Sequence, residues 1–188
     1  MYIILEGIDT AGKSTQLEYL KQNYPEAIFT KEPGGTEIGL EIRQMVLGAK
    51  CQSKIAEMFL FLADRAEHTE KIIKKNIDKM IISDRGFISG IAYAKEFDIN
   101  LLKQLNDIAL DGIYPNKIIM LELTSNELKY RLSQKVNDGI ELRGIDYLLK
   151  IQSRMKKIIT ELNIPSLIID ASEDKEQIAQ KIKDFING

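Results

Sequence analysis

The stretch Gly7-Ile8-Asp9-Thr10-Ala11-Gly12-Lys13-Ser14 matches the pattern G-x-x-x-x-G-K-[ST] of a phosphate-binding loop, or P-loop. A short apolar run, Tyr2–Leu5, leads into it, and Leu17 and Leu20 follow at helical spacing. The motif has its physical meaning only between a strand and a helix. These residues therefore predict a strand, a phosphate-binding turn and a helix in immediate succession.

The loop supplies groups that hold a nucleoside triphosphate. Its glycines let backbone N–H groups turn toward an anion, and the helix beginning at Lys13 adds the positive end of its dipole. Lys13 brings a positive charge to the β- and γ-phosphates, and the Ser14 hydroxyl is a ligand for Mg²⁺. The predicted cofactor-binding residues form one continuous segment: Gly7, Ile8, Asp9, Thr10, Ala11, Gly12, Lys13, Ser14 and Thr15.

A second acidic group accompanies the loop. The apolar run Met80–Ile82 is followed by Ser83 and Asp84. In P-loop proteins an aspartate at the end of a neighbouring strand holds the Mg²⁺ shell. Asp84 is therefore predicted to bind metal together with Ser14, and a role as the N-cap of the next helix is the alternative.

Short apolar runs recur along the chain with helical patterns between them. Continuous rather than alternating polarity indicates strands buried on both faces, as in a parallel sheet. The runs are Tyr2–Leu5, Ala27–Phe29, Met80–Ile82, Ile118–Leu121 and Leu167–Ile169. The later helices are expected over 53 to about 76, from Ser125 as N-cap, over 140–162 and over 175–186. The alternation predicts an α/β fold with a five-stranded parallel sheet and helices on both faces.

Composition narrows the function. With 188 residues, one domain over 1–188 is expected. One cysteine and one histidine exclude a disulfide framework and a Cys/His zinc site, and a net charge of −2 gives no basic field for nucleic acid. No apolar run reaches membrane-spanning length and no signal segment is visible, so a cytoplasmic location is expected. His68 is expected on a helix surface.

Further polar residues follow the predicted strands, where ligands bind in such sheets. Phe61 and Arg65 are spaced i and i+4, so they share a helix face, where a ring can stack on a base and a guanidinium can donate to its edge. Packing in the core is the alternative for Phe61, and a solvated ion pair with Glu57, Asp64 or Glu70 is the alternative for Arg65. The remaining groups of interest are Lys31–Thr36, Arg43, Asp84-Arg85, Ser89 and Tyr93.

In one collinear order, these features resemble the thymidylate kinases. The resemblance rests on Gly7–Ser14, Glu32-Pro33-Gly34-Gly35-Thr36, Arg43, Phe61–Arg65, Asp84-Arg85, Ser89, Tyr93 and Tyr114-Pro115. The run Glu-Pro-Gly-Gly-Thr after a P-loop strand is specific to that family. The resemblance implies a P-loop NTPase fold and transfer of the ATP γ-phosphoryl group to dTMP, giving dTDP for dTTP synthesis. It also implies ATP, Mg²⁺ and dTMP as small-molecule partners and a homodimer joined through helices.

The resemblance also implies roles for individual residues. Phe61 would stack on thymine, and Arg65 would donate to its carbonyl. Arg43 and Arg85 would hold the dTMP phosphate. The implied substrate-binding set is Asp9, Glu32, Pro33, Arg43, Phe61, Arg65, Arg85, Ser89 and Tyr93. The nucleophile is an anionic phosphate oxygen, so the reaction needs alignment and positive charge rather than a general base.

The transition-state arginine is expected from a lid at about 131–144, because Thr10 and Ala11 stand where other thymidylate kinases carry it in the P-loop. The expected catalytic set is Lys13, Asp9, Arg85, Arg143, Arg131 and Lys135. An ordinary helix-surface position is the alternative for Arg131. Gly86 and Gly90 replace larger residues of many relatives and are expected to open space near the base.

Two competing functions stay open. A deoxynucleoside kinase would use Glu32 as a base to activate a 5′-hydroxyl, but Arg43 and Arg85 would then have no acceptor phosphate to hold. A nucleotide switch without catalysis would be expected to lose Lys13, Asp84 or Arg85, and all three are present. Nucleic acid and membranes are not expected partners.

Overall fold

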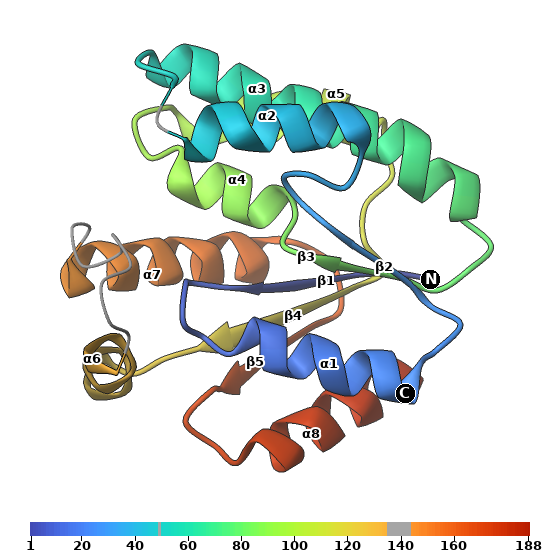
Figure 1. The fold of residues 1–188 in the computed structure, drawn as a ribbon, viewed down its shortest axis with the longest axis vertical. Helices are drawn as coiled ribbons and strands as arrows, with labels where there is room; N and C mark the ends of the chain where they lie inside the picture. Colours follow the sequence, from blue (N-terminus) through green and yellow to red (C-terminus); the bar gives the residue numbers. More distant parts are fainter. Residues whose placement is uncertain (49, 135–143) are drawn as a thin grey trace.

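A computed structural model describes residues 1–48, 50–134 and 144–188. Five strands form one sheet in which every neighbouring pair is parallel, in the order β2-β3-β1-β4-β5 (Figure 1). Each strand overlaps a predicted apolar run, with bounds that differ by at most two residues. The strands are β1 (Tyr2–Gly7), β2 (Ile28–Lys31), β3 (Ile81–Asp84), β4 (Lys117–Glu122) and β5 (Ser166–Asp170).

Helices cover both faces of this sheet. α1 packs with α8 on one face, and α4 packs with α7 on the other, while α2, α3 and α5 form a further layer beyond α4 (Figure 1). The helices are α1 (Lys13–Asn23), α2 (Glu37–Leu47), α3 (Lys54–His68), α4 (Phe87–Tyr93), α5 (Ile99–Leu110), α6 (Ser125–Ser133), α7 (Ile145–Glu161) and α8 (Lys175–Asn187). None of the helices in the described ranges is long and apolar enough to cross a bilayer.

Helix boundaries depart from the sequence pattern at three places. The expected helix 53–76 is α-helical only to His68, and it continues as a π-helical turn (Thr69–Ile73) and a 3₁₀ turn (Lys74–Asn76). The predicted Ser125 cap is wrong, because the Thr124 hydroxyl accepts from the Glu127 N–H and Ser125 is the first helical residue. The helix expected over 140–162 is α7, and residues 140–143 lie outside the described ranges.

The strand register brings the functional segments together. β1 is the central strand, and Leu5 pairs with Asp84 of β3, which in turn pairs with Lys31 of β2. The chain leaves these three strands at the same edge of the sheet, as the parallel arrangement requires. The loops after β1, β2 and β3 therefore meet over one side of the molecule.

Candidate active site

The P-loop connects β1 to α1 through unusual backbone angles. Gly7 has φ +148° and Gly12 has φ +95°, values that residues with a Cβ rarely adopt. A Cβ on Gly7 would also lie 2.9 Å from the Leu121 carbonyl oxygen of β4. Glycine at this position therefore lets the loop start directly against the sheet.

Lys13 holds its amine inside the loop. Its Nζ donates to the carbonyl oxygens of Gly7 and Ile8, at 3.0 and 3.1 Å. Burial, followed by repulsion from the Arg85 guanidinium, lowers the pKa of Lys13 to about 8. The loop thus carries a buried cation whose charge is not fully compensated.

Asp84 and Ser14 fit the requirements of a magnesium site. One carboxylate oxygen of Asp84 is buried and has no hydrogen-bond partner in the described part of the chain, whereas Ser14 is exposed at the start of α1. A buried oxygen of this kind is costly unless a cation or donor arrives. The described residues hold no cluster of three or more His, Cys, Asp or Glu side chains suited to a metal. Mg²⁺ commonly binds to one or two protein oxygens plus phosphates and water, so these two residues suit it.

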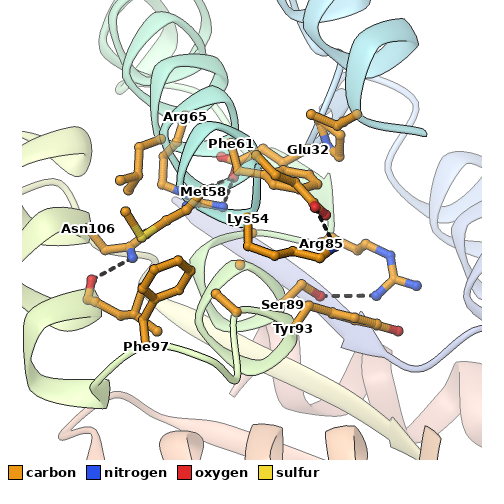
Figure 2. Close-up of a pocket in the computed structure, with 18 of the residues that line it drawn as sticks. Glu32, Lys54, Met58, Phe61, Arg65, Arg85, Ser89, Tyr93, Phe97 and Asn106 are labelled. Carbon is orange, nitrogen blue, oxygen red and sulfur yellow. Dashed lines mark hydrogen bonds and ion pairs between the residues drawn. The ribbon is translucent and has the colours of Figure 1, made fainter. Parts of the chain in front are cut away.

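A cavity of about 480 Å³ opens beside the P-loop (Figure 2). All nine residues predicted to bind substrate line it: Asp9, Glu32, Pro33, Arg43, Phe61, Arg65, Arg85, Ser89 and Tyr93. Figure 2 shows Arg85, Ser89 and Tyr93 on one side of the cavity and Arg65, Met58 and Asn106 on the other. Three arginines, Arg43, Arg65 and Arg85, therefore line the cavity, with Arg65 and Arg85 on opposite sides of it.

Arg85 is held at the end of the cavity nearest the P-loop. Its Nη2 lies 2.6 Å from Oδ1 of Asp9, and its Nη1 donates to the Gly7 carbonyl at 2.9 Å and the Ser89 hydroxyl at 3.0 Å. The backbone of Arg85 has φ +67°, an uncommon angle for a residue with a side chain. These contacts fix a cation beside the loop that receives the triphosphate.

Glu6 fixes the residues that surround Arg85. Its Oε1 accepts the backbone N–H groups of Gly86 and Ser89, at 3.0 and 3.1 Å, and its Oε2 accepts the Ser89 hydroxyl. Burial raises the pKa of Glu6. Sequence reasoning assigned Glu6 no role, although a charged residue inside an otherwise apolar strand was a signal that it has a buried partner.

Arg65 is fixed at the other end of the cavity. Its Nε and Nη2 lie 2.9 and 2.8 Å from Oε2 of Glu32, and its Nη1 donates to Oδ1 of Asn106 at 2.6 Å. Arg65 is buried, so its interpretation as a solvated partner of acids on its own helix is wrong. Asn106 was not identified from the sequence, because it comes from α5, 41 residues further along the chain.

His68 is fully buried, which contradicts the expected surface position. Its Nδ1 lies 2.8 Å from Oε1 of Glu32, and its Nε2 lies 2.7 Å from the Thr30 hydroxyl. Burial would raise the pKa of Glu32, but the Arg65 charge and the His68 hydrogen bond lower it to about 2. Glu32 is therefore a firmly ionised carboxylate with both oxygens engaged.

Two further contacts shape the loop after β2. The Gly34 N–H donates to Oδ1 of Asp64 at 2.9 Å, and Nη1 of Arg43 donates to the Pro33 carbonyl at 2.9 Å. Burial raises the pKa of Asp64 to about 6, although the bond from Gly34 opposes the rise. The loop is thus tied to both α2 and α3.

Family membership follows from a direct comparison. A family model described as thymidylate kinase matches residues 5–182. This chain belongs to the thymidylate kinase family.

Full-length relatives agree with this assignment. The thymidylate kinase of Aliarcobacter butzleri is 60% identical over 187 residues, spanning 100% of this chain and 99% of its own length. The thymidylate kinase of Sulfurimonas denitrificans is 56% identical over 190 residues and both chains are fully covered. The crystal structure of thymidylate kinase from Ehrlichia chaffeensis superposes with a TM-score of 0.76 at 28% identity, covering 100% of this chain and 98% of that one. The predicted P-loop NTPase fold is confirmed.

The lid candidates of this thymidylate kinase family member lie after β4. Arg131 of α6 reaches the P-loop, donating from Nη1 to the Thr10 carbonyl at 3.1 Å and from Nη2 to the Ala171 carbonyl at 2.5 Å. It is therefore not an ordinary surface residue. Lys135 and Arg143 lie outside the described residues.

Space expected at two glycines is already occupied. A Cβ on Gly90 would lie 3.0 Å from both Nη1 and Nη2 of Arg65, and a Cβ on Gly86 would lie 3.2 Å from the Ile4 side chain. The absence of side chains at these positions lets Arg65 and β1 approach α4 closely. Both glycines still line the cavity.

Proposed function

We propose that this enzyme transfers the γ-phosphoryl group of ATP to dTMP, giving dTDP, as a step in dTTP synthesis. The observation that carries the proposal is the lining of the cavity. Phe61 and Arg65 line it, and so does Arg85, which lies beside the P-loop. A nucleoside monophosphate has the same two ends, a base and a phosphate. The family membership supplies thymine as the base.

The proposed chemistry is an in-line displacement. A dTMP phosphate oxygen bonds to the γ-phosphorus of ATP while the bond from that phosphorus to the bridging oxygen of ADP breaks. Arg43 and Arg85 hold the acceptor phosphate, and Lys13 holds the donor phosphates. The contribution of the protein is to align two mutually repelling anions and to neutralise their charge.

Magnesium completes the proposed donor site. Ser14 and Asp84 would hold it, and when bound it would neutralise the charge that develops on the ATP phosphates. Asp84 supports this role through its buried carboxylate oxygen, which has no hydrogen-bond partner within 1–48, 50–134 and 144–188. Asp9 lies on the acceptor side of the loop, where its pairing with Arg85 fits a position beside the acceptor phosphate and sugar.

The transition-state cation is proposed to come from the lid at about 131–144, with Arg131, Lys135 and Arg143 as candidates. Arg131 is supported by its contact with the Thr10 carbonyl of the P-loop. We also propose that residues 1–188 form a single kinase domain, supported by one sheet shared by all five strands.

We propose a cytoplasmic location as well. The support for it is that the chain has a single cysteine, Cys51, and that this cysteine is free.

A second copy of the chain is the proposed protein partner. The helices α2, α3 and α5 form an outer layer of the molecule (Figure 1). Large apolar side chains on these helices are exposed. They are Ile38, Leu40, Met45, Leu47, Ile55, Phe59, Leu101 and Ile108. A homodimer through these helices would remove that apolar surface from water.

A deoxynucleoside kinase is the weaker candidate. It would need Glu32 to accept a proton from a 5′-hydroxyl. Both oxygens of Glu32 are already engaged, by Arg65 and His68, and a pKa of about 2 makes this carboxylate a poor base. The phosphate-binding arginines would also lack a partner on a neutral nucleoside.

The deciding experiment measures ADP release with a panel of acceptors at saturating Mg-ATP. We expect turnover with dTMP, slower turnover with dUMP, and only background rates with thymidine, AMP, GMP and CMP. Stimulation by thymidine but not by dTMP would replace the proposal with a nucleoside kinase. Absence of stimulation by any acceptor would refute kinase activity.

A further inference from the structure

The single histidine of the chain has no part in the proposed chemistry, yet it is among the most enclosed side chains of the molecule. His68 is the last residue of α3, and its side chain is 0% exposed. It does not line the cavity. A polar ring in such a place requires partners, and both of its nitrogens have one.

The partners of His68 form a continuous series that reaches the cavity. The Thr30 hydroxyl lies 2.7 Å from Nε2 of His68, Nδ1 of His68 lies 2.8 Å from Oε1 of Glu32, and Oε2 of Glu32 binds Arg65. All of these side chains except Thr30 are nearly or fully buried. A displacement of His68 would therefore be transmitted to Glu32 without water to absorb it.

The direction of the central hydrogen bond follows from the chemistry of its members. Glu32 is ionised, so it can only accept, and Nδ1 of His68 must carry the donated proton. The ring is thereby fixed in one orientation, because Nε2 faces Thr30 at the opposite side. His68 thus holds one oxygen of Glu32 while Arg65 uses the other.

The hydrogen bonds of Arg65 explain how the fixed position of the Glu32 carboxylate affects the cavity. A guanidinium has five N–H groups. Glu32 engages Nε and Nη2, and Asn106 engages Nη1, so among the described residues one N–H on Nη1 and one on Nη2 have no partner. These two are the groups that remain for a base carbonyl, and their direction is set by the plane of the Glu32 carboxylate.

A second observation connects His68 with the Glu-Pro-Gly-Gly segment. A Cβ on Gly35 would lie 2.6 Å from Cδ2 of His68 and 2.7 Å from the Thr30 hydroxyl oxygen. Only glycine leaves room for the ring at this point. The segment therefore contacts His68 at two places, the Glu32 carboxylate and the backbone of Gly35.

We propose that His68 is a positioning residue for base recognition, which fixes the Glu32 carboxylate and through it directs the free N–H groups of Arg65 at the base. The proposal rests on the proposed role of Arg65 in binding thymine. This role gives the single histidine of the chain a function that requires no contact with the substrate. It also explains why Glu32 is buried although it performs no proton transfer.

Two substitutions separate the bond to Glu32 from the bond to Thr30. In His68→Asn the side-chain nitrogen can occupy the place of Nδ1 and still donate to Glu32, whereas in His68→Gln it can occupy the place of Nε2 and reach only Thr30. Since a hydrogen bond to a charged group is the stronger of the two, we expect His68→Gln to raise KM for dTMP by about tenfold or more. We expect His68→Asn to stay within about threefold of the wild type, and KM for ATP to change by less than about twofold in both.

The acceptor preference is a readout that general destabilisation would not move. The ratio of kcat/KM for dTMP to that for dCMP should fall in His68→Gln and recover in His68→Asn, because cytosine has an amino group in place of the C4 carbonyl of thymine and cannot accept from Arg65 at that position. Equal effects of the two variants, or a fall in kcat with both KM values unchanged, would overturn the positioning role. Arg65→Lys tests the premise in the same assay: if it leaves the ratio unchanged, the proposed role of Arg65 fails independently of His68.

A measurement on the unaltered protein covers the case in which the variants do not fold. Because the chain has one histidine, its imidazole ¹⁵N signals belong to His68 without further assignment. We expect the tautomer protonated on Nδ1 and a change in its signal when dTMP is added. Protonation on Nε2 alone, or a signal that saturating dTMP does not change, would refute the proposal.

Discussion

Nη2 of Arg85 lies 2.6 Å from Oδ1 of Asp9, so the residue after β3 is joined to the P-loop by an ion pair whose two members line the cavity. Arg85 is the cation and the anion belongs to the loop that holds the donor. An incoming acceptor phosphate carries the same charge as Asp9. In the proposed reaction the pair would mark the place where acceptor and donor meet, and Arg85 would exchange the Asp9 carboxylate for the acceptor phosphate.

Arg85→Ala is expected to act mainly on the acceptor. Losing a partly buried guanidinium that is proposed to bind the acceptor phosphate should raise KM for dTMP by about 100-fold and leave KM for ATP within about threefold. Arg85→Lys is the matched control: it keeps a charge but loses the fork, so its effect should be intermediate. Steady-state kinetics with each substrate varied in turn makes the test, and equal changes in both KM values would contradict the assignment.

Lys13→Met is expected to remove activity and keep the fold. Methionine retains the apolar stem but not the amine that faces the phosphates, so kcat should fall about 10³-fold. The melting temperature should not decrease, because the substitution removes a buried charge that burial penalises. Turnover and thermal unfolding measured on the same sample provide the check. A variant with wild-type turnover would show that the P-loop assignment is wrong.

The pKa of Lys13 predicts how ATP affinity depends on pH. In the free enzyme this pKa is about 8, so above that pH the amine loses the proton that binding of a polyphosphate requires. The dissociation constant for ATP should therefore be flat below about pH 7.5 and rise by up to about tenfold per pH unit above about pH 8. Titration calorimetry at constant ionic strength tests this, with Lys13→Met as the control that should lack the rise.

The same group predicts a trend in stability. The folded-state pKa of about 8 lies below 10.5, the ordinary pKa of a lysine, so between these values the unfolded chain binds the extra proton. The contribution of Lys13 to the free energy of unfolding therefore rises with pH across that window and is lowest below pH 8. Denaturant unfolding at pH 7.5 and 9.5 should show a rise that is smaller in Lys13→Met. A rise of equal size in both proteins would exclude Lys13 as its source.

Local patterns predicted the framework of the molecule because its causes are local. β-branched runs specify buried strands, and the spacing of Gly7, Gly12 and Lys13 specifies a phosphate loop. Parallel topology then requires that the residues following the strands meet, which is why all nine predicted substrate-binding residues line one cavity. These inferences need no knowledge of distant partners.

Side chains whose role depends on distant partners were not predicted. His68 bonds Glu32 across 36 positions, and Glu6 bonds Ser89 across 83. On α3 alone, His68 is one polar residue among several charged neighbours, and nothing local indicates that it faces the core. Such pairs depend on how the helices pack on the sheet, which residue spacing does not determine.

Arg131→Ala is expected to act on the donor side. The side chain binds the Thr10 carbonyl of the P-loop and the Ala171 carbonyl after β5. Its removal should lower kcat/KM for ATP by about 10- to 100-fold and change KM for dTMP by less than about twofold. Glu127→Gln, which alters only the partner of Nε, is the matched control and should have a small effect. A selective rise in KM for dTMP would contradict the placement of Arg131 beside the donor.

The proposed dimer predicts that charge on α3 separates the subunits. Ile55 and Phe59 are spaced i and i+4 on one face of α3, and the side chain of Phe59 is 55% exposed. In a two-fold symmetric dimer, Phe59→Glu would place one negative charge from each subunit in an apolar interface. Sedimentation should therefore show a monomer for this variant and a dimer for the wild type. Ile77→Glu is the matched control, because Ile77 is 57% exposed but lies beyond the 3₁₀ turn, outside α2, α3 and α5. That variant should remain a dimer. If Phe59→Glu also remains a dimer at micromolar concentration, the outer layer of these helices is not the interface.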